Sequence, residues 1–148
     1  YSGTVGAAIA GRRLNYVPVA FSVKSFQPKN LEFISEKSAI ITEQVTHLPA
    51  DQNLLVNVNF PDLPSSKIEG IKITRLGKRG TPETPDLIKT NESSSFYSFG
   101  PSGALMPDQV NTDMQAVENN FISISILDYN LTASESKFQS YEEIFTNA

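Results

Sequence analysis

The first sixty residues contain two short apolar runs separated by a long segment with helical periodicity. Residues 18–23 and 53–60 are rich in apolar and β-branched side chains, which predicts two buried strands. Residues 31–48 carry apolar side chains at spacings of seven, four and three residues, which places them on one face of a helix. These side chains are Ile34, Ile41, Val45 and Leu48. A strand, a helix and a second strand in this order form a βαβ unit with parallel strands and a right-handed crossover.

Another helix is predicted at the start of the chain. Residues 5–14 are rich in alanine and follow three small residues, Ser2, Gly3 and Thr4. A Ser or Thr before such a run is typical of a helix N-cap, because its oxygen accepts a free N–H of the first turn. The same N–H groups attract anions, so these three residues form either an ordinary cap or a phosphate-binding site. With the βαβ unit, this helix predicts that residues 1–60 belong to a doubly wound, Rossmann-like α/β fold with a mostly parallel sheet.

The pattern changes after residue 60, where proline and glycine become frequent. Residues 71–74 alternate apolar and polar side chains, as in a strand that is exposed on one face. Residues 77–109 are dense in proline and glycine and contain one convincing strand, at residues 96–99. We therefore expect an extended β-hairpin arm in this region rather than a compact core.

A strand and a helix are predicted near the C-terminus. Residues 121–127 alternate isoleucine with serine, which predicts a half-buried strand. Residues 134–145 carry an apolar stripe at helical spacing, which predicts an amphipathic helix. Such a terminal helix packs either on its own domain or on a partner subunit.

Composition and charge narrow the classes of function. Hydrophobic residues make up 39% of the 148 residues and charged residues 19%, as in soluble globular domains. The net charge of −4 argues against binding to a nucleic-acid polymer. Cysteine is absent, which excludes disulfides and fits a reducing compartment. Because there is neither a membrane-length apolar run nor a signal-peptide pattern, we expect a cytoplasmic protein without membrane contact.

Four short motifs occur in order along nearly the whole chain. They are residues 1–8 (YSGTVGAA), 57–64 (NVNFPDLP), 74–79 (TRLGKR) and 112–117 (TDMQAV), the last followed by Phe121-Ile122-Ser123-Ile124. In this order they resemble the SurE family of stationary-phase survival proteins, which are metal-dependent nucleotidases. The chain departs from the family pattern at three places. Ala10 stands where a Glu is usual, Asn111 stands where a Gly is usual, and Asn119-Asn120 replaces a pair that ends in Gly.

The resemblance implies that the chain corresponds to the C-terminal half to two-thirds of a family member. Residues 1–60 would be the C-terminal part of the nucleotidase core. Residues 61–148 would supply the arm, the returning strand and an oligomerisation segment for a homodimer or tetramer. The ligands of a divalent metal, Mg or Mn, are expected upstream of Tyr1, so no metal ligand and no catalytic residue is assigned within these residues.

Within this chain the resemblance points to a phosphate-binding role for Ser2, Gly3 and Thr4. Asn57 and Asn59 are predicted at the carboxyl end of a parallel strand, where α/β sheets bind ligands, although asparagines there also bond neighbouring loops.

Six other positions are candidates for the site. Arg75, Lys78 and Arg79 either contact an anionic substrate or solvate an exposed strand. Thr112 with Asp113 is typical of a turn or cap pair, and His47 of a helix C-cap.

The function that follows is hydrolysis of nucleoside monophosphates to nucleoside and phosphate, by a 5′- and 3′-nucleotidase. The isolated 148 residues are expected to be inactive, because the metal ligands are absent from them. The alternative is a non-catalytic oligomerisation module, in which residues 61–148 only supply arm and tail contacts.

Overall fold

The structure is a computed structural model that describes residues 3–11, 15–49, 53–99, 103–104, 106, 109–128, 130, 132 and 134–135. Its centre is a four-stranded sheet in the order β1-β2-β6-β3. These strands are β1 (Val19–Val23), β2 (Leu54–Phe60), β6 (Phe121–Asp128) and β3 (Gly70–Thr74). The pairs β1–β2 and β3–β6 are parallel, whereas β2–β6 is antiparallel. The expected α/β fold with a mostly parallel sheet is confirmed.

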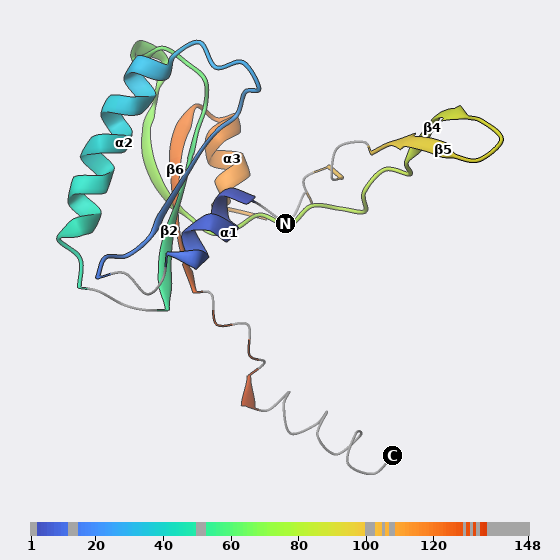
Figure 1. The fold of residues 1–148 in the computed structure, drawn as a ribbon. Coiled ribbons are helices and arrows are strands. Elements are labelled where there is room, and N and C mark those ends of the chain that lie inside the picture. Colours follow the sequence, from blue (N-terminus) through green and yellow to red (C-terminus); the bar gives the residue numbers. More distant parts are fainter. Residues whose placement is uncertain are drawn as a thin grey trace.

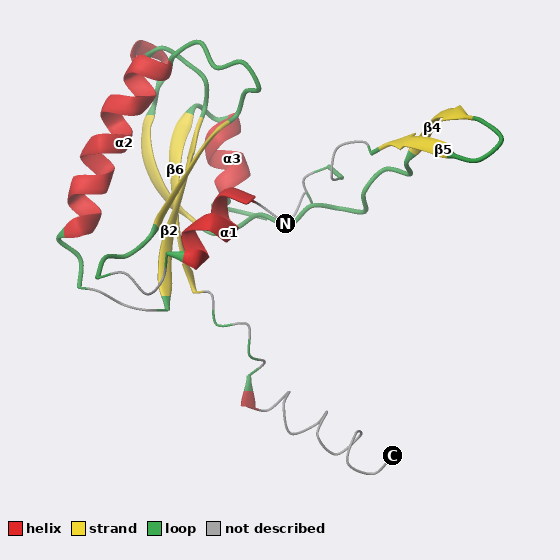
Figure 2. Ribbon diagram, viewed as in Figure 1, coloured by secondary structure: helices red, strands yellow, loops and turns green. Residues whose placement is uncertain are grey.

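Helices cover both faces of this sheet. Helix α2 (Leu31–Thr46) lies on one side, and α1 (Gly3–Ala10) and α3 (Asp113–Glu118) lie on the other (Figure 1). Figure 2 shows the same layers by type of secondary structure. A short 3-10 helix, η1 (Ser65–Lys67), connects β2 to β3. None of the helices in the described residues has both the length and the apolar character that a bilayer crossing needs.

The hydrophobic core forms between α2 and the sheet. Side chains at alternate positions of β2, Val56, Val58 and Phe60, pack with Ile34 and Ile41 of the helix. Val58 and Phe60 are completely buried. The predicted βαβ unit of residues 18–60 is confirmed. Burial of a large apolar side chain contributes roughly 1.5–3 kcal/mol, so this layer supplies much of the stability of the fold.

Helices α1 and α2 have other ends in the structure than the sequence predicted. Helix α2 ends at Thr46, and the backbone N–H of His47 donates to Gln44, which confirms His47 as the C-cap. Leu48 therefore lies beyond the helix and is half exposed, so its predicted place on the buried face is wrong. Helix α1 begins at Gly3, two residues earlier than predicted, so Thr4 belongs to its first turn. Gly11 follows α1 as a turn, and Ser2 lies outside the described residues.

The prediction that β6 is half-buried is wrong. Ser123 and Ser125 are both 0% exposed, although their alternation with isoleucine suggested an open polar face. Strand β6 is an inner strand between β2 and β3, and α3 packs over its serine side. The hydroxyl of Thr74 lies 2.8 Å from each serine hydroxyl, so these buried polar groups bond one another. Small hydroxyl side chains satisfy their hydrogen bonds locally and let a helix approach the sheet closely.

Strand β3 exposes its apolar side chains. Ile71 and Ile73 are 50% and 62% exposed, whereas Thr74 is buried. These isoleucines lie opposite Ile122 and Ile124 of β6 in the parallel register. They are therefore on the same face of the sheet as the core side chains that α2 covers. Strand β3 lies at the edge of the sheet opposite β1, and β1 is the edge strand that α2 contacts.

The predicted hairpin arm is confirmed. Strands β4 (Asp86–Thr90) and β5 (Ser95–Ser98) pair in antiparallel fashion and project away from the sheet (Figure 1). The sequence predicted only β5 as a strand, at residues 96–99, whereas β4 was not predicted. The pairing of the two strands shifts in register between Leu87 and Lys89. The turn between them is stabilised by the side chain of Asn91, which accepts from the backbone N–H groups of Ser93 and Ser94. The predicted C-terminal helix of residues 134–145 lies outside the described residues apart from its first two.

Two asparagines take the left-handed backbone conformation. Asn111 has φ 57° and Asn120 has φ 65°, and they are the only non-glycine residues with positive φ in the part of the chain that the structure describes. At both positions asparagine replaces the glycine that is usual in the family pattern. Asparagine tolerates this conformation better than other non-glycine residues, so the turns on either side of α3 keep their shape.

Asp62, just after β2, holds the loop that leads into α2. Its carboxylate accepts hydrogen bonds from the backbone N–H groups of Lys29 and Asn30 and from the Asn30 side chain, at 2.9–3.1 Å. The Asn30 side chain first, and then the Lys29 backbone N–H, hold the pKa of the Asp62 carboxyl below its usual range. The ionised carboxylate therefore ties the loop after β1 to the end of β2.

We predict that the contribution of Asp62 depends on pH. A pKa lowered by folding gives stability that is present above the pKa of the unfolded chain, about 4, and is lost as pH falls through the folded value. Asp62→Asn should lower the urea midpoint at pH 7, and this difference should shrink at pH 3. The control is Asp86→Asn on the exposed hairpin. An equal difference at both pH values would contradict the prediction.

Candidate functional site

A cavity of about 530 Å³ opens on the face of the sheet that carries α3, at the carboxyl ends of β1 and β2. Ligand sites of small molecules have volumes of this order, and open α/β sheets place them at the carboxyl ends of parallel strands. The lining comes from β1 and the residue after it, from β2, from the segment after β3 and from α3. It consists of Ser22, Val23, Lys24, Asn59, Gly77, Arg79, Asp113, Met114, Val117 and Glu118.

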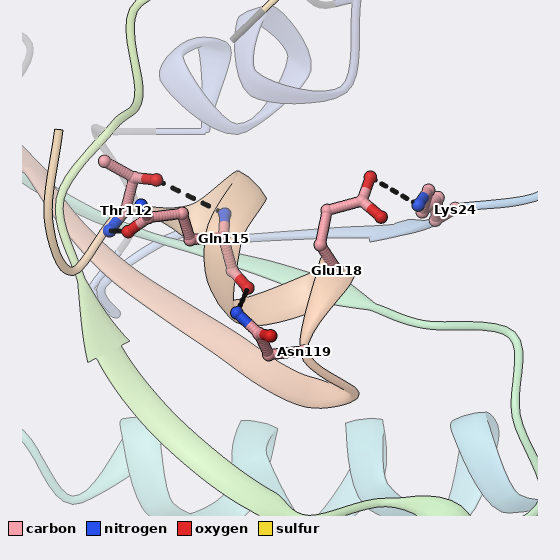
Figure 3. A network of polar contacts seen from close by, with 5 residues as sticks. All are labelled: Lys24, Thr112, Gln115, Glu118 and Asn119. Carbon is pink, nitrogen blue, oxygen red and sulfur yellow. Dashed lines mark hydrogen bonds and ion pairs between the residues drawn. The ribbon is translucent and has the colours of Figure 1, made fainter. Parts of the chain in front are cut away.

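Helix α3 is set in place by a capping box. The hydroxyl of Thr112 accepts from the backbone N–H of Gln115 at 3.2 Å, and the side chain of Gln115 accepts from the backbone N–H of Thr112 at 3.5 Å (Figure 3). Asn119 closes the other end by donating to the carbonyl of Gln115. The prediction that Thr112 begins a cap is confirmed. Such caps typically contribute about 0.5–2 kcal/mol, which is substantial for a helix of six residues.

The carboxylate of Asp113 joins two of the sequence motifs. Its Oδ1 accepts from the backbone N–H of Gly77 at 2.8 Å and from that of Met114 at 2.9 Å. The backbone N–H of Asp113 in turn donates to the carbonyl of Arg75. A side chain on residue 77 would place its Cβ 2.6 Å from the end of Met114 and 3.3 Å from Asp113 Oδ1. Glycine at this position therefore permits the close contact between residues 74–79 and 112–117.

An ion pair spans the cavity wall. Lys24 Nζ lies 2.6 Å from Glu118 Oε1 and links the end of β1 to the last turn of α3 (Figure 3). Both side chains are more than half exposed, so the pair contributes at most about 1 kcal/mol to stability. The ion pair places a cation and an anion side by side on one wall of the cavity.

The predicted site residues divide into two groups. Asn59 and Arg79 line the cavity, and Arg79 also donates from Nη1 to the carbonyl of Gly103 at 3.2 Å. Asn57 lies in the middle of β2 instead of at its end and is buried, opposite Ser125 in the register.

Of the remaining candidates in the described residues, Asp113 lines this cavity and the others do not. Arg75 and Lys78 follow β3 at exposed positions. Gly3 and Thr4 are exposed on the first turn of α1. The phosphate-binding role expected of Ser2, Gly3 and Thr4 stays a prediction.

Sequence reasoning missed several residues of the cavity. Asn59 was predicted because ligands bind at the carboxyl ends of parallel strands, and the same rule applies to Ser22 and Lys24. Ser22 is the register partner of Asn59, and Lys24 follows the end of β1. Glu118 carried no such signal, since its contact with Lys24 joins residues 94 positions apart.

The acidic groups of this cavity do not fit a divalent metal. No group of three or more His, Cys, Asp or Glu side chains that could hold a metal ion occurs among the described residues. Asp113 accepts two backbone N–H groups and Glu118 pairs with Lys24. The expectation that the metal ligands lie upstream of Tyr1 stays a prediction.

Comparison with known proteins identifies the family to which this chain belongs. The family model described as "Survival protein SurE" matches residues 1–83. The chain belongs to the SurE family. It is similar to a 5'-nucleotidase SurE from Vibrio campbellii, with 37% identity over 136 residues, which are 92% of the chain and 52% of the relative. It is also similar to a 5'/3'-nucleotidase SurE from Wigglesworthia glossinidia brevipalpis, with 33% identity over 147 residues, or 99% and 58% of the two lengths.

A solved structure supports the same conclusion. The crystal structure of the SurE protein from Aquifex aeolicus superposes with a TM-score of 0.76 at 29% identity, covering 99% of this chain and 58% of that one. The chain therefore spans about half the length of the curated relatives it matches. The resemblance to the SurE family that the four sequence motifs suggested is confirmed.

We predict that the Asp113 carboxylate stabilises this site mainly as a hydrogen-bond acceptor. Asp113→Ala should reduce the free energy of unfolding by about 1–3 kcal/mol, because the N–H of Gly77 loses its partner. Asp113→Asn keeps an acceptor oxygen of the same shape and should cost less than half as much. Urea unfolding at pH 7 measures both variants. Equal losses would show that the hydrogen bond to Gly77 is not the source of the effect.

Proposed function

We propose that this chain forms part of a phosphomonoester hydrolase that converts nucleoside monophosphates, 5′ and 3′, to nucleoside and phosphate. The observation that carries the proposal is the cavity at the carboxyl ends of β1 and β2, which Lys24, Asn59 and Arg79 help to line, in a chain of the SurE family. Its relatives named 5'-nucleotidase and 5'/3'-nucleotidase support the class of substrate. The absence of cysteine supports a cytoplasmic location, which is part of the same proposal.

The residues of the cavity suit a phosphorylated ligand. The guanidinium of Arg79 offers charged donors that match phosphate oxygens, and the carboxamide of Asn59 offers two neutral donors and an acceptor. Ser22, the register partner of Asn59, adds a hydroxyl beside it. In this proposal Ser2, Gly3 and Thr4 contribute further phosphate contacts at the start of α1.

A divalent cation, Mg or Mn, belongs to the proposal as the group that neutralises phosphate charge. Its ligands are proposed to lie in the part of the relatives that this chain does not span, since the described acidic residues do not fit such a site.

We predict that a protein extended upstream to the length of its relatives releases phosphate from AMP when Mn is supplied, and that residues 1–148 alone do not. Replacing Asn59 by Ala in the extended protein should lower kcat/KM about 10- to 100-fold, from the loss of a hydrogen bond to a charged group. Asn130→Ala, far along the chain from the cavity lining, is the control. Phosphate is measured colorimetrically. Absence of phosphate release by the extended protein would refute the proposed function.

The alternative proposal assigns residues 61–148 an oligomerisation role, as a homodimer or tetramer contact. The supporting observation is the exposure of large apolar side chains on the hairpin, each more than half exposed. They are Leu87, Ile88, Phe96, Tyr97 and Phe99. Large exposed apolar side chains gathered on one element are typical of surfaces that contact another protein. The two proposals are compatible in an intact enzyme and differ in what the 148 residues do alone.

We predict that Ile88→Asp lowers the mass of the protein in sedimentation velocity, because a charge on this surface opposes apolar contact. Ser94→Asp, in the turn of the same hairpin, should leave the mass unchanged. Removing the residues after Ala133 should also reduce the mass if the tail is exchanged between subunits. A monomer in every case, wild type included, would count against an oligomerisation role.

A further inference from the structure

Phe26 is the most exposed large apolar side chain among the described residues, at 107% of its reference area. It lies in the loop that connects β1 to α2. A phenylalanine left in water forgoes the stabilisation that burial would give, so the complete exposure of Phe26 makes it a candidate for contact with a ligand.

Hydrogen bonds restrain the loop that carries Phe26. The backbone N–H of Lys24 donates to the carbonyl of Phe60, and that of Gln27 donates to the hydroxyl of Ser25. At the far end of the loop, Lys29 and Asn30 donate to the Asp62 carboxylate. Both ends of the loop are therefore attached to β2 or to the residues that follow it. A restrained loop presents an aromatic ring at a lower entropic cost than a flexible one.

The same loop begins at the cavity. Ser22, Val23 and Lys24 line it, and Phe26 follows two residues later. Two residues span at most about 7 Å, so the backbone of Phe26 lies within one side-chain length of the cavity rim. In Figure 1 the loop after β1 projects toward the side of the sheet that carries α3, and the Lys24–Glu118 ion pair joins that loop to α3.

We propose that Phe26 is a stacking platform for the base of a nucleotide whose phosphate lies inside the cavity. The proposal rests on the proposed nucleotidase function. The distribution of groups matches the two ends of such a ligand, since the cations Lys24 and Arg79 line the cavity and the fully exposed Phe26 follows Lys24 by two residues in the chain. A ring stacks on every base, so Phe26 strengthens binding of nucleotides over other phosphomonoesters without selecting one base.

The test compares AMP with ribose 5-phosphate, which has the phosphate and sugar but no base. In the extended, Mn-supplied protein, Phe26→Ala should lower kcat/KM for AMP about 5- to 150-fold, the range expected for one stacked base. Its kcat/KM for ribose 5-phosphate should stay unchanged. Phe26→Trp should retain or exceed the wild-type value with AMP.

The control is Tyr16→Ala, which removes an exposed aromatic side chain at the amino end of β1, where a different cavity lies. Equal effects of Phe26→Ala on both substrates, or none on AMP, would overturn stacking while the nucleotidase function stands. If wild type releases no phosphate from either substrate, the proposed function fails. AMP binding by calorimetry then decides stacking, because an unchanged Kd in Phe26→Ala, or no binding at all, overturns it.

Discussion

The position of β2 inside the sheet is the constraint on which the rest of the structure depends. It pairs with β1 on one edge and with β6 on the other, and its two faces are covered by different helices. Side chains therefore alternate between an apolar layer under α2 and a polar layer under α3. Val58 and Phe60 point into the first layer, and Asn57 and Asn59 belong to the second. One strand thus supplies both the core and a wall of the cavity.

The polar layer explains how the candidate site is supported. Thr74, Ser123 and Ser125 form a buried cluster of hydroxyl groups beside the register position of Asn57. Buried hydroxyls that bond one another remove the cost of leaving polar groups unpaired, and they rigidify the surface beneath a site. Above this cluster, Asp113 holds the segment that carries Gly77 against the start of α3. The cavity is therefore bounded by elements that are each attached to the sheet.

Asp62 and Asp113 perform similar tasks on different segments. Each carboxylate accepts at least two backbone N–H groups and attaches a connecting segment to a neighbouring element. Asp62 belongs to the motif at the end of β2, and Asp113 belongs to the motif that begins α3. Charge-assisted hydrogen bonds of this kind are stronger than neutral ones. Each of these two aspartates therefore has a structural role within its motif.

Local sequence patterns were enough to predict the family and most of the helices and strands, although β4 and α3 were not predicted. Apolar periodicity over residues 18–60 was enough to predict the βαβ unit, because each element buries one face at its own period. Thr112 and His47 were identified as caps, since capping involves only residues within one helical turn. The tertiary structure decided the burial of Ser123 and Ser125, because an alternating strand has the same pattern whether or not a helix covers its polar face. It also decided the contacts Lys24–Glu118 and Gly77–Asp113, which join residues 94 and 36 positions apart and depend on how distant strands pair.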